Sequence, residues 1–225
     1  GGYRHLLCGI TRVQDHIPHF VRELFAKDMP IRIISDFAMA HSVTSYALKW
    51  GDGIEIEHAK AKEKNIPFIT HCSEGFDEET LKSVETLAAK KALSKQTVLI
   101  HGIAFSDRDI EMLAENQCSV VWCPVSNLYM FEQTARVKEL IEAGVNVTLG
   151  TDGGLNNNTH DMFAEMKASC LLQNASRRSA KAFTALEALE MATINGAKAI
   201  GRAHELGSIE PGKLADITLL DLNRP

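Results

Sequence analysis

Residues 68–74 read Phe-Ile-Thr-His-Cys-Ser-Glu, and residues 97–102 read Thr-Val-Leu-Ile-His-Gly. In each stretch a short run of apolar or β-branched residues ends at a histidine. The runs do not alternate between apolar and polar residues, which is typical of strands buried on both faces, and such strands occur mainly in parallel sheets. The two stretches therefore predict parallel strands that each carry a histidine at the carboxyl end.

Five more runs of this kind occur along the chain: Gly9–Val13, Ile31–Ile34, Ser45–Leu48, Ser119–Trp122 and Val145–Leu149. The segments between the runs have helical periodicity, except where the third and fourth strands crowd together. Helices are predicted over His19–Lys27, Ile54–Glu63, Glu78–Ala92, Asp107–Glu115, Ala135–Ala143, Asn157–Leu172 and Thr184–Ile200. Repeated alternation of strand and helix is typical of βαβ units.

The count of seven strands predicts the architecture. An eight-stranded β/α barrel takes about 250 residues, and this chain has 225. We therefore predict an α/β fold, a (β/α)8 TIM barrel whose first strand is missing. An open doubly wound sheet is the alternative, but no G-x-G-x-x-G follows the first strand and no phosphate-binding loop occurs.

The composition excludes several classes of protein. Hydrophobic residues make up 45% and charged residues 24% of the chain, which is typical of globular proteins. The formal net charge is −5, so no basic surface for nucleic acid or for an anionic membrane is predicted. No apolar run is long enough for a membrane helix. The 5 cysteines include no C-x-x-C, which favours reduced thiols in a cytoplasmic protein.

Reactive side chains follow three of the predicted strands at their carboxyl ends, where the active sites of β/α barrels lie. They are His71, His101 and Asp152, and Glu74 comes three residues after His71. Imidazole and carboxylate groups are the usual ligands of zinc and ferrous iron, and a bound metal lowers the pKa of water until hydroxide forms. The pattern predicts a hydrolytic metal site in which Asp152 accepts a proton and Glu74 delivers one.

Structural roles are the alternative for each of these residues taken singly. A lone histidine after a strand is commonly a hydrogen-bonding residue, and an aspartate between threonine and glycine is common in turns. The coincidence of three such residues at one end of the sheet favours the metal site. His160 lies in a loop that could face the mouth. Structural or surface roles are expected for His16, His19, His41, His58, His204, Cys72 and Cys123.

Five stretches that occur in a fixed order identify a family resemblance: Thr70-His71-Cys72-Ser73-Glu74-Gly75, Leu99-Ile100-His101-Gly102, Trp122-Cys123-Pro124-Val125-Ser126-Asn127, Leu149-Gly150-Thr151-Asp152-Gly153, and residues 207–217. Their kind and spacing resemble the amidohydrolase superfamily, in the branch of cytosine, guanine and adenosine-type deaminases and chlorohydrolases. The resemblance covers nearly the whole chain.

The resemblance implies a β/α barrel that holds one divalent metal, zinc or iron. It implies that His71 and Asp152 are metal ligands, and that His101 contacts the metal-bound water or the substrate, or binds the metal directly. Glu74 resembles the family's proton shuttle to a ring nitrogen. Substrate contacts are expected from Asn127, Trp122 and Asn156.

The chain departs from the family pattern in one respect. The family carries an H-x-H pair on its first strand, and no two of the 9 histidines here are two residues apart. We expect the first strand to lie before Gly1 and the metal affinity of this chain to be weak. The expected domains are a barrel over residues 1–206, with strands two to eight, and a turn and new strand over 207–225 that begin the return to a small β-sandwich.

Three functions are compatible with these residues. The first is metal-dependent hydrolysis of a non-peptide C–N bond, the deamination of a nitrogen heterocycle, and Glu74 favours it because protonating the ring nitrogen makes the adjacent carbon electrophilic. The second is hydrolysis of an amide, or of another leaving group such as halide, on the same type of ring. The third is a metal-free, non-catalytic barrel that binds a ligand. A small-molecule substrate is expected, without nucleic acid or membrane partners, and a homodimer is compatible with the fold.

Overall fold

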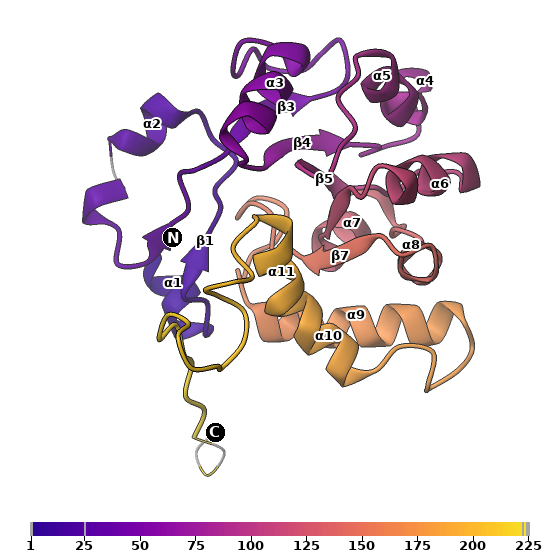
Figure 1. Cartoon of the computed structure of the whole chain (residues 1–225). Helices are drawn as coiled ribbons and strands as arrows, with labels where there is room; N and C mark the ends of the chain where they lie inside the picture. The colour runs from indigo at the N-terminus through magenta and orange to yellow at the C-terminus, as the bar shows by residue number, and fades with distance from the viewer. Residues whose placement is uncertain (1, 25, 222, 224–225) are drawn as a thin grey trace.

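The computed structural model describes residues 2–24, 26–221 and 223, and it has an α/β fold built on parallel strands (Figure 1). Five strands form one parallel sheet in the order β3-β4-β5-β6-β7, and β1 and β2 form a separate parallel pair. The strands are β1 (Arg12–Val13), β2 (Arg32–Ile33), β3 (Ala38–Ser42), β4 (Phe68–Cys72), β5 (Thr97–His101), β6 (Ser119–Trp122) and β7 (Asn146–Leu149). The predicted α/β class and consecutive parallel order are confirmed.

Helices connect the strands and cover the outside of the sheet. They are α1 (Gly2–Leu7), α2 (His19–Glu23), the 3-10 helix η1 (Ala26–Asp28), α3 (Ile54–Lys64), α4 (Glu78–Leu81), α5 (Ser83–Ala89), α6 (Asp107–Glu115), α7 (Pro124–Phe131), α8 (Val137–Glu142), α9 (Met162–Ser176), α10 (Ala185–Ala192) and α11 (Ile194–Ala199). Capping boxes at Ser106 and Thr184 begin α6 and α10, because each side chain accepts a hydrogen bond from the third helical residue. No helix in the described part of the chain is long and apolar enough to cross a membrane.

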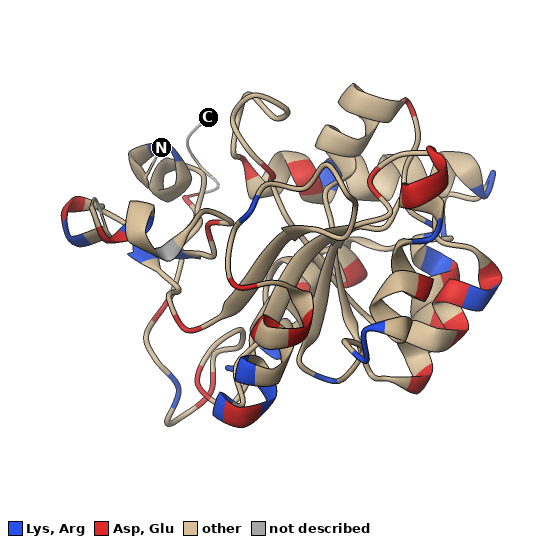
Figure 2. Cartoon of the chain, turned by 90° about the horizontal axis from the view of Figure 1, so that it is seen from above, with Lys and Arg blue, Asp and Glu red and all other residues tan. Residues whose placement is uncertain are grey.

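The central strands are buried on both faces, as their unbroken apolar runs predict. Phe68, Leu99 and Val120 lie in a large apolar cluster that includes the helices, whereas Ile69 and Val98 lie in a second cluster on the opposite face. Charged side chains lie mainly on the surrounding helices, and the strands at the centre carry few of them (Figure 2). Burial on two faces therefore holds the sheet rigid beneath its carboxyl ends.

One predicted strand is wrong. Ser45–Leu48 forms turn and irregular structure, and the strand lies instead at Ala38–Ser42, where Ala38 and Met39 pair with β4. Ser45 donates its backbone N–H and its hydroxyl to Glu79, at 2.6 and 2.7 Å, so its polar groups are satisfied by a side chain instead of a strand ladder. The true strand contains small and polar residues, which hides it from a search for β-branched runs.

The sheet is divided because too few residues join β2 to β3. Only residues 34–37 separate these strands, and parallel neighbours need a crossover of about a dozen residues or more. The predicted crowding of strands thus falls between the second and third strands. Among the described residues β1 pairs with β2 and β7 pairs with β6, so the first and last strands do not pair with each other, as expected of a barrel that lacks its first strand.

The segment after α11 turns back to the N-terminal part of the chain. Asp216 is half-buried, and its side chain, 7% exposed, forms ion pairs with Arg12 and Arg32. The Thr218 hydroxyl donates to the Gly9 carbonyl at 2.8 Å. Within residues 207–221 and 223 no strand is formed, so the strand predicted there is not found; residues 222, 224 and 225 of that range lie outside the described residues. The division into a barrel and the start of a sandwich stays a prediction.

Candidate metal centre and active site

Side chains from three strands meet at the carboxyl end of the sheet. His71 lies in β4 and His101 is the last residue of β5, and the register pairs Cys72 with His101, so both strands end at one level. The two imidazole rings stack with their centroids 5.4 Å apart. Asp152 follows β7 closely enough for its charge to act on both rings. The two histidines therefore lie together, whereas Asp152 acts on them by its charge and lies outside the group of donor atoms within 4.8 Å of one another.

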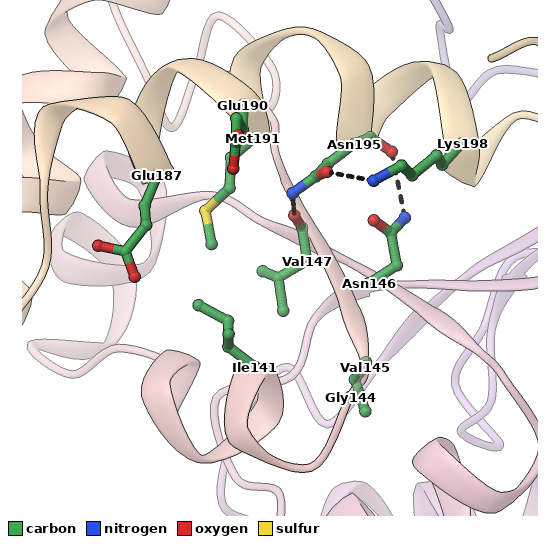
Figure 3. A pocket seen from close by; sticks show the side chains of 10 residues that line it. All are labelled: Ile141, Gly144, Val145, Asn146, Val147, Glu187, Glu190, Met191, Asn195 and Lys198. Atoms are coloured by element: carbon green, nitrogen blue, oxygen red, sulfur yellow. Dashed lines mark hydrogen bonds between the residues drawn. The ribbon is translucent and has the colours of Figure 1, made fainter.

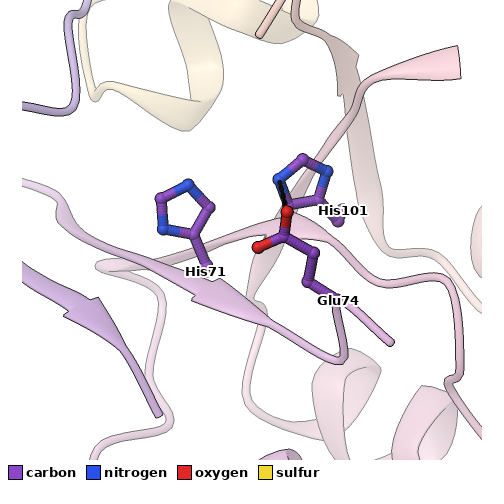
Figure 4. Close-up of side chains that lie close together, drawn as sticks. All are labelled: His71, Glu74 and His101. Atoms are coloured by element: carbon purple, nitrogen blue, oxygen red, sulfur yellow. Dashed lines mark ion pairs between the residues drawn. The ribbon is translucent and has the colours of Figure 1, made fainter. Parts of the chain in front are cut away.

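Glu74 forms a close group of potential metal-binding atoms with His71 and His101. Nitrogens of His71 and His101 and a carboxylate oxygen of Glu74 lie within 4.8 Å of one another (Figure 4). Glu74 Oε1 is 3.3 Å from His101 Nε2. Burial raises the pKa of Glu74, against the lowering effect of His71. The carboxyl group is therefore biased towards its protonated form, in which it can donate a proton.

The outer nitrogens of the two histidines fix their tautomers. His71 Nδ1 donates to the His41 carbonyl oxygen, and His101 Nδ1 donates to Asn127 Oδ1 at 2.9 Å. Both Nε2 atoms are then left with a lone pair. Burial lowers the pKa of both rings, so the neutral form is favoured. Metal-binding histidines almost always have such an oxygen acceptor behind them, and His101 Nε2 is buried without a hydrogen bond. The residues present therefore fit a divalent metal.

Asp152 is held in its ionised form by its neighbours. Ser126 donates its hydroxyl to the carboxylate, as do the Gly153 backbone N–H at 2.6 Å and the Asn156 amide at 3.2 Å. Burial opposes the charge, but His101 and these hydrogen bonds outweigh it, and the net effect lowers the pKa of Asp152. The pKa values of Asp152 and Glu74 are therefore shifted in opposite directions.

The backbone at two of these residues is in the left-handed region, with φ of 77° at His101 and 56° at Asp152. Strict alternation along β5 would direct His101 to the helix-covered face, where Leu99 lies. The positive φ breaks that alternation, and the ring stacks on His71 instead. A non-glycine residue in this region is strained, and such strain is typical of functional sites.

The three residues expected to contact substrate lie in different places. Asn156 contacts Asp152 at the mouth, whereas Asn127 is fully buried and reaches His101 from below. Trp122 is not brought to the site: its ring is fully buried among the helices, where Nε1 donates to Thr134 Oγ1 at 2.7 Å. Alternation along β6 explains this, since Trp122 shares the helix-covered face with Val120.

Sequence reasoning missed two residues at the mouth. His41, expected to be a surface or packing residue, lies in β3 one residue before its end, with its ring centroid 5.3 Å from that of His71. His41 Nδ1 accepts the Leu48 backbone N–H at 3.2 Å, which leaves Nε2–H as a donor. Ser126 was hidden because no helix was predicted at α7. The apolar residues before His41 could have indicated the strand that carries it. Pro124, a typical first-turn residue of a helix, could have indicated the helix that carries Ser126.

Two cavities lie near β3 and β7. One of about 510 Å3 is lined by His41 and Trp50, beside the candidate site. The other, of about 300 Å3, lies at the start of β7, where Asn195 donates to the Val147 carbonyl at 3.0 Å (Figure 3). Asn146 begins β7 and Asp152 follows its end, so the second cavity is at the opposite end of the strand.

The fold and the site together define a β/α-barrel protein whose histidines and carboxylates meet at the carboxyl ends of parallel strands. The amidohydrolase family profile matches residues 27–225, and the chain belongs to the amidohydrolase family.

Proteins similar to this chain include deaminases. It is 32% identical to the 5-methylthioadenosine/S-adenosylhomocysteine deaminase of Clostridium tetani, over 97% of this chain and 53% of that protein. It is 38% identical to the 5'-deoxyadenosine deaminase of Methanothermobacter thermautotrophicus, over 74% of this chain and 40% of that protein. The zinc-bound crystal structure of an adenosine deaminase from Xanthomonas campestris matches with a TM-score of 0.81 and 25% identity, over 95% and 58% of the two chains. The chain spans about half the length, or less, of these two curated relatives.

Proposed function

We propose that this chain forms the catalytic face of a metal-dependent deaminase that hydrolyses the exocyclic C–N bond of an adenosine-like heterocycle. The observation that carries the proposal is a pair of carboxyl groups with opposite proton affinities beside two neutral imidazoles. Burial raises the pKa of Glu74, whereas His101 and hydrogen bonds lower that of Asp152 against the effect of its own burial. Two titratable groups whose pKa values are driven apart are typical of an acid and a base in one site.

The metal would be held by His71, His101 and Asp152, which offer two neutral nitrogens and one carboxylate. A bound divalent metal makes water ionise near neutral pH and so supplies a nucleophile. Asn127 accepts the hydrogen bond from His101 Nδ1 and so keeps the proton on that nitrogen. The lone pair of Nε2 is then available to a metal. Asn127 would thus act on the reaction through His101.

The proton transfers follow from the two carboxyl groups. Glu74 would give its proton to a ring nitrogen of the substrate, which draws electrons from the adjacent carbon. Asp152 would take a proton from the attacking water and pass it to the leaving amino group, so that a C–O bond forms, the C–N bond breaks and ammonia departs. The remaining proton of the water would return to Glu74 as the new hydroxyl becomes a carbonyl, which restores the acid. His41 Nε2–H, at the edge of the mouth, would donate to an acceptor on the substrate.

The test compares Glu74→Gln with Asp152→Asn. Glutamine keeps the shape of Glu74 but has no acidic proton to transfer. Ammonia release from adenosine or 5'-methylthioadenosine should therefore fall by about 100- to 10,000-fold, while zinc content is retained. Asp152→Asn should lower zinc content and turnover together. Glu111→Gln, at an exposed ion pair with Arg108 on α6, is the matched control and should change neither.

The opposite pattern, in which Glu74→Gln loses zinc and Asp152→Asn keeps it, contradicts the assigned roles. Release of halide, or hydrolysis of an amide bond, without release of ammonia from an aminated heterocycle supports the second reaction class instead. Ligand binding with neither zinc nor turnover indicates a non-catalytic barrel.

We also propose a cytoplasmic location, which the 5 free cysteines support. A homodimer stays a prediction.

A further inference from the structure

His16 is a buried imidazole next to the candidate metal site that the proposed mechanism does not use. It follows β1, and its ring packs edge-on against that of His71 with the centroids 4.7 Å apart. His16 Nε2 donates to the Ala40 carbonyl oxygen at 3.0 Å. His16 Nδ1 is sealed from solvent and has no hydrogen-bond partner. A buried polar atom without a partner costs about 1–3 kcal/mol, so its presence calls for a reason.

His16, His71 and His101 share one arrangement. Each donates one ring N–H to an oxygen atom, and the acceptors are the Ala40 carbonyl, the His41 carbonyl and Asn127 Oδ1. The other nitrogen of each ring is therefore a bare acceptor, and on His16 and His101 it is buried without a hydrogen bond. A fixed outer N–H and a free inner lone pair are the usual state of a histidine that binds a metal.

Other histidines of the chain differ from this arrangement. His41 accepts a backbone N–H from Leu48, and His58 Nε2 bonds the Ser94 hydroxyl at 2.8 Å behind α3. His160 also has a bare Nδ1, but its ring packs on His5, with the centroids 4.6 Å apart, in the loop after β7. Only the three rings around His71 combine an oxygen acceptor, a bare nitrogen and mutual contact among the described residues.

We propose that His16 is a metal ligand of this chain, acting with His71 and His101. The proposal rests on the metal of the proposed function and adds a nitrogen that the expected ligand set does not contain. His16 lies outside the group whose donor atoms are within 4.8 Å of one another. Its ring must therefore move towards His71 when metal binds, which requires its backbone hydrogen bonds with Ala40 and His41 to shift.

The experiment titrates the chain with Zn²⁺ against a competing chelator and with Co²⁺ followed by its visible absorption. His16→Gln is compared with His58→Gln, a buried histidine with one hydrogen bond and no contact with the site. Loss of an outer partner of a ligand lowers metal affinity by about 10–100-fold. Loss of a ligand should exceed that range and change the Co²⁺ spectrum, and His58→Gln should change neither.

A second measurement covers the case in which His16→Gln fails to fold. In the unchanged chain, the nitrogen resonance of His16 Nδ1 should move on addition of Zn²⁺, together with those of His71 and His101 Nε2. Unaltered zinc affinity, an affinity loss with an unaltered Co²⁺ spectrum, or a static His16 Nδ1 resonance overturns the proposal. Each of those results leaves deamination as the function. Conversely, His16-dependent zinc binding without ammonia release supports the ligand and refutes the proposed function.

Discussion

Replacing Glu165 with glutamine should remove a large part of the pH dependence of stability above pH 4.5. Glu165 lies on α9, is fully buried, and accepts the Val125 backbone N–H at 3.2 Å and the Asn157 amide. Asn157 also donates to the Thr151 carbonyl at 2.8 Å. The carboxyl group thus ties the start of α7 to the loop that carries Asp152. Burial, the dominant cause, raises the pKa of Glu165 from 4.5 to about 7.

The magnitude follows from that shift. The folded chain binds a proton at Glu165 that the unfolded chain releases near pH 4.5. The stabilising contribution is therefore fully present below pH 4.5 and is lost as the pH rises through about 7. One pKa unit corresponds to about 1.4 kcal/mol, so the loss is about 3 kcal/mol in free energy of unfolding. Glutamine cannot ionise, so the Glu165→Gln protein should not lose this free energy of unfolding as the pH rises.

The assay is urea unfolding of both proteins at a series of pH values, because the difference between them cancels the titration of all other groups. The stability of Glu165→Gln relative to the unchanged chain should rise by about 3 kcal/mol from pH 4.5 to pH 8. Glu142→Gln, at an exposed position on α8, is the control for the loss of a carboxyl group. A constant difference for Glu165→Gln over this pH range would refute the reasoning.

Two further predictions concern the support of the site and of the C-terminal segment. Asn127→Ala removes the acceptor of His101 Nδ1, so zinc affinity should fall by about 10–100-fold, as measured by chelator competition, and an unchanged affinity contradicts the positioning role. Asp216→Asn removes the charge that holds Arg12 and Arg32, so amide hydrogen exchange over residues 213–221 should accelerate while that of the central sheet stays the same. Equal exchange in both proteins means that the ion pairs do not hold the segment.

The strands at the centre and the chemical groups at their ends could be predicted from the sequence. Phe68–Thr70 and Thr97–Ile100 are apolar without alternation because both faces of the sheet are buried, and this requirement is visible in composition alone. His71 and His101 end their strands, so parallel pairing had to bring them to one edge. The capping boxes at Ser106 and Thr184 are equally local, since each joins residues three apart.

The tertiary structure decided the features that depend on distant neighbours. Ala38–Ser42 is a strand because β4 lies beside it, and His41 and His16 reach the site only through that pairing and the fold of β1. His101 faces His71 because its backbone is left-handed, whereas Trp122 keeps the alternation of β6 and stays in the core. A sequence pattern reports local period and burial, but the direction of one side chain is set by contacts formed only when remote segments pack together.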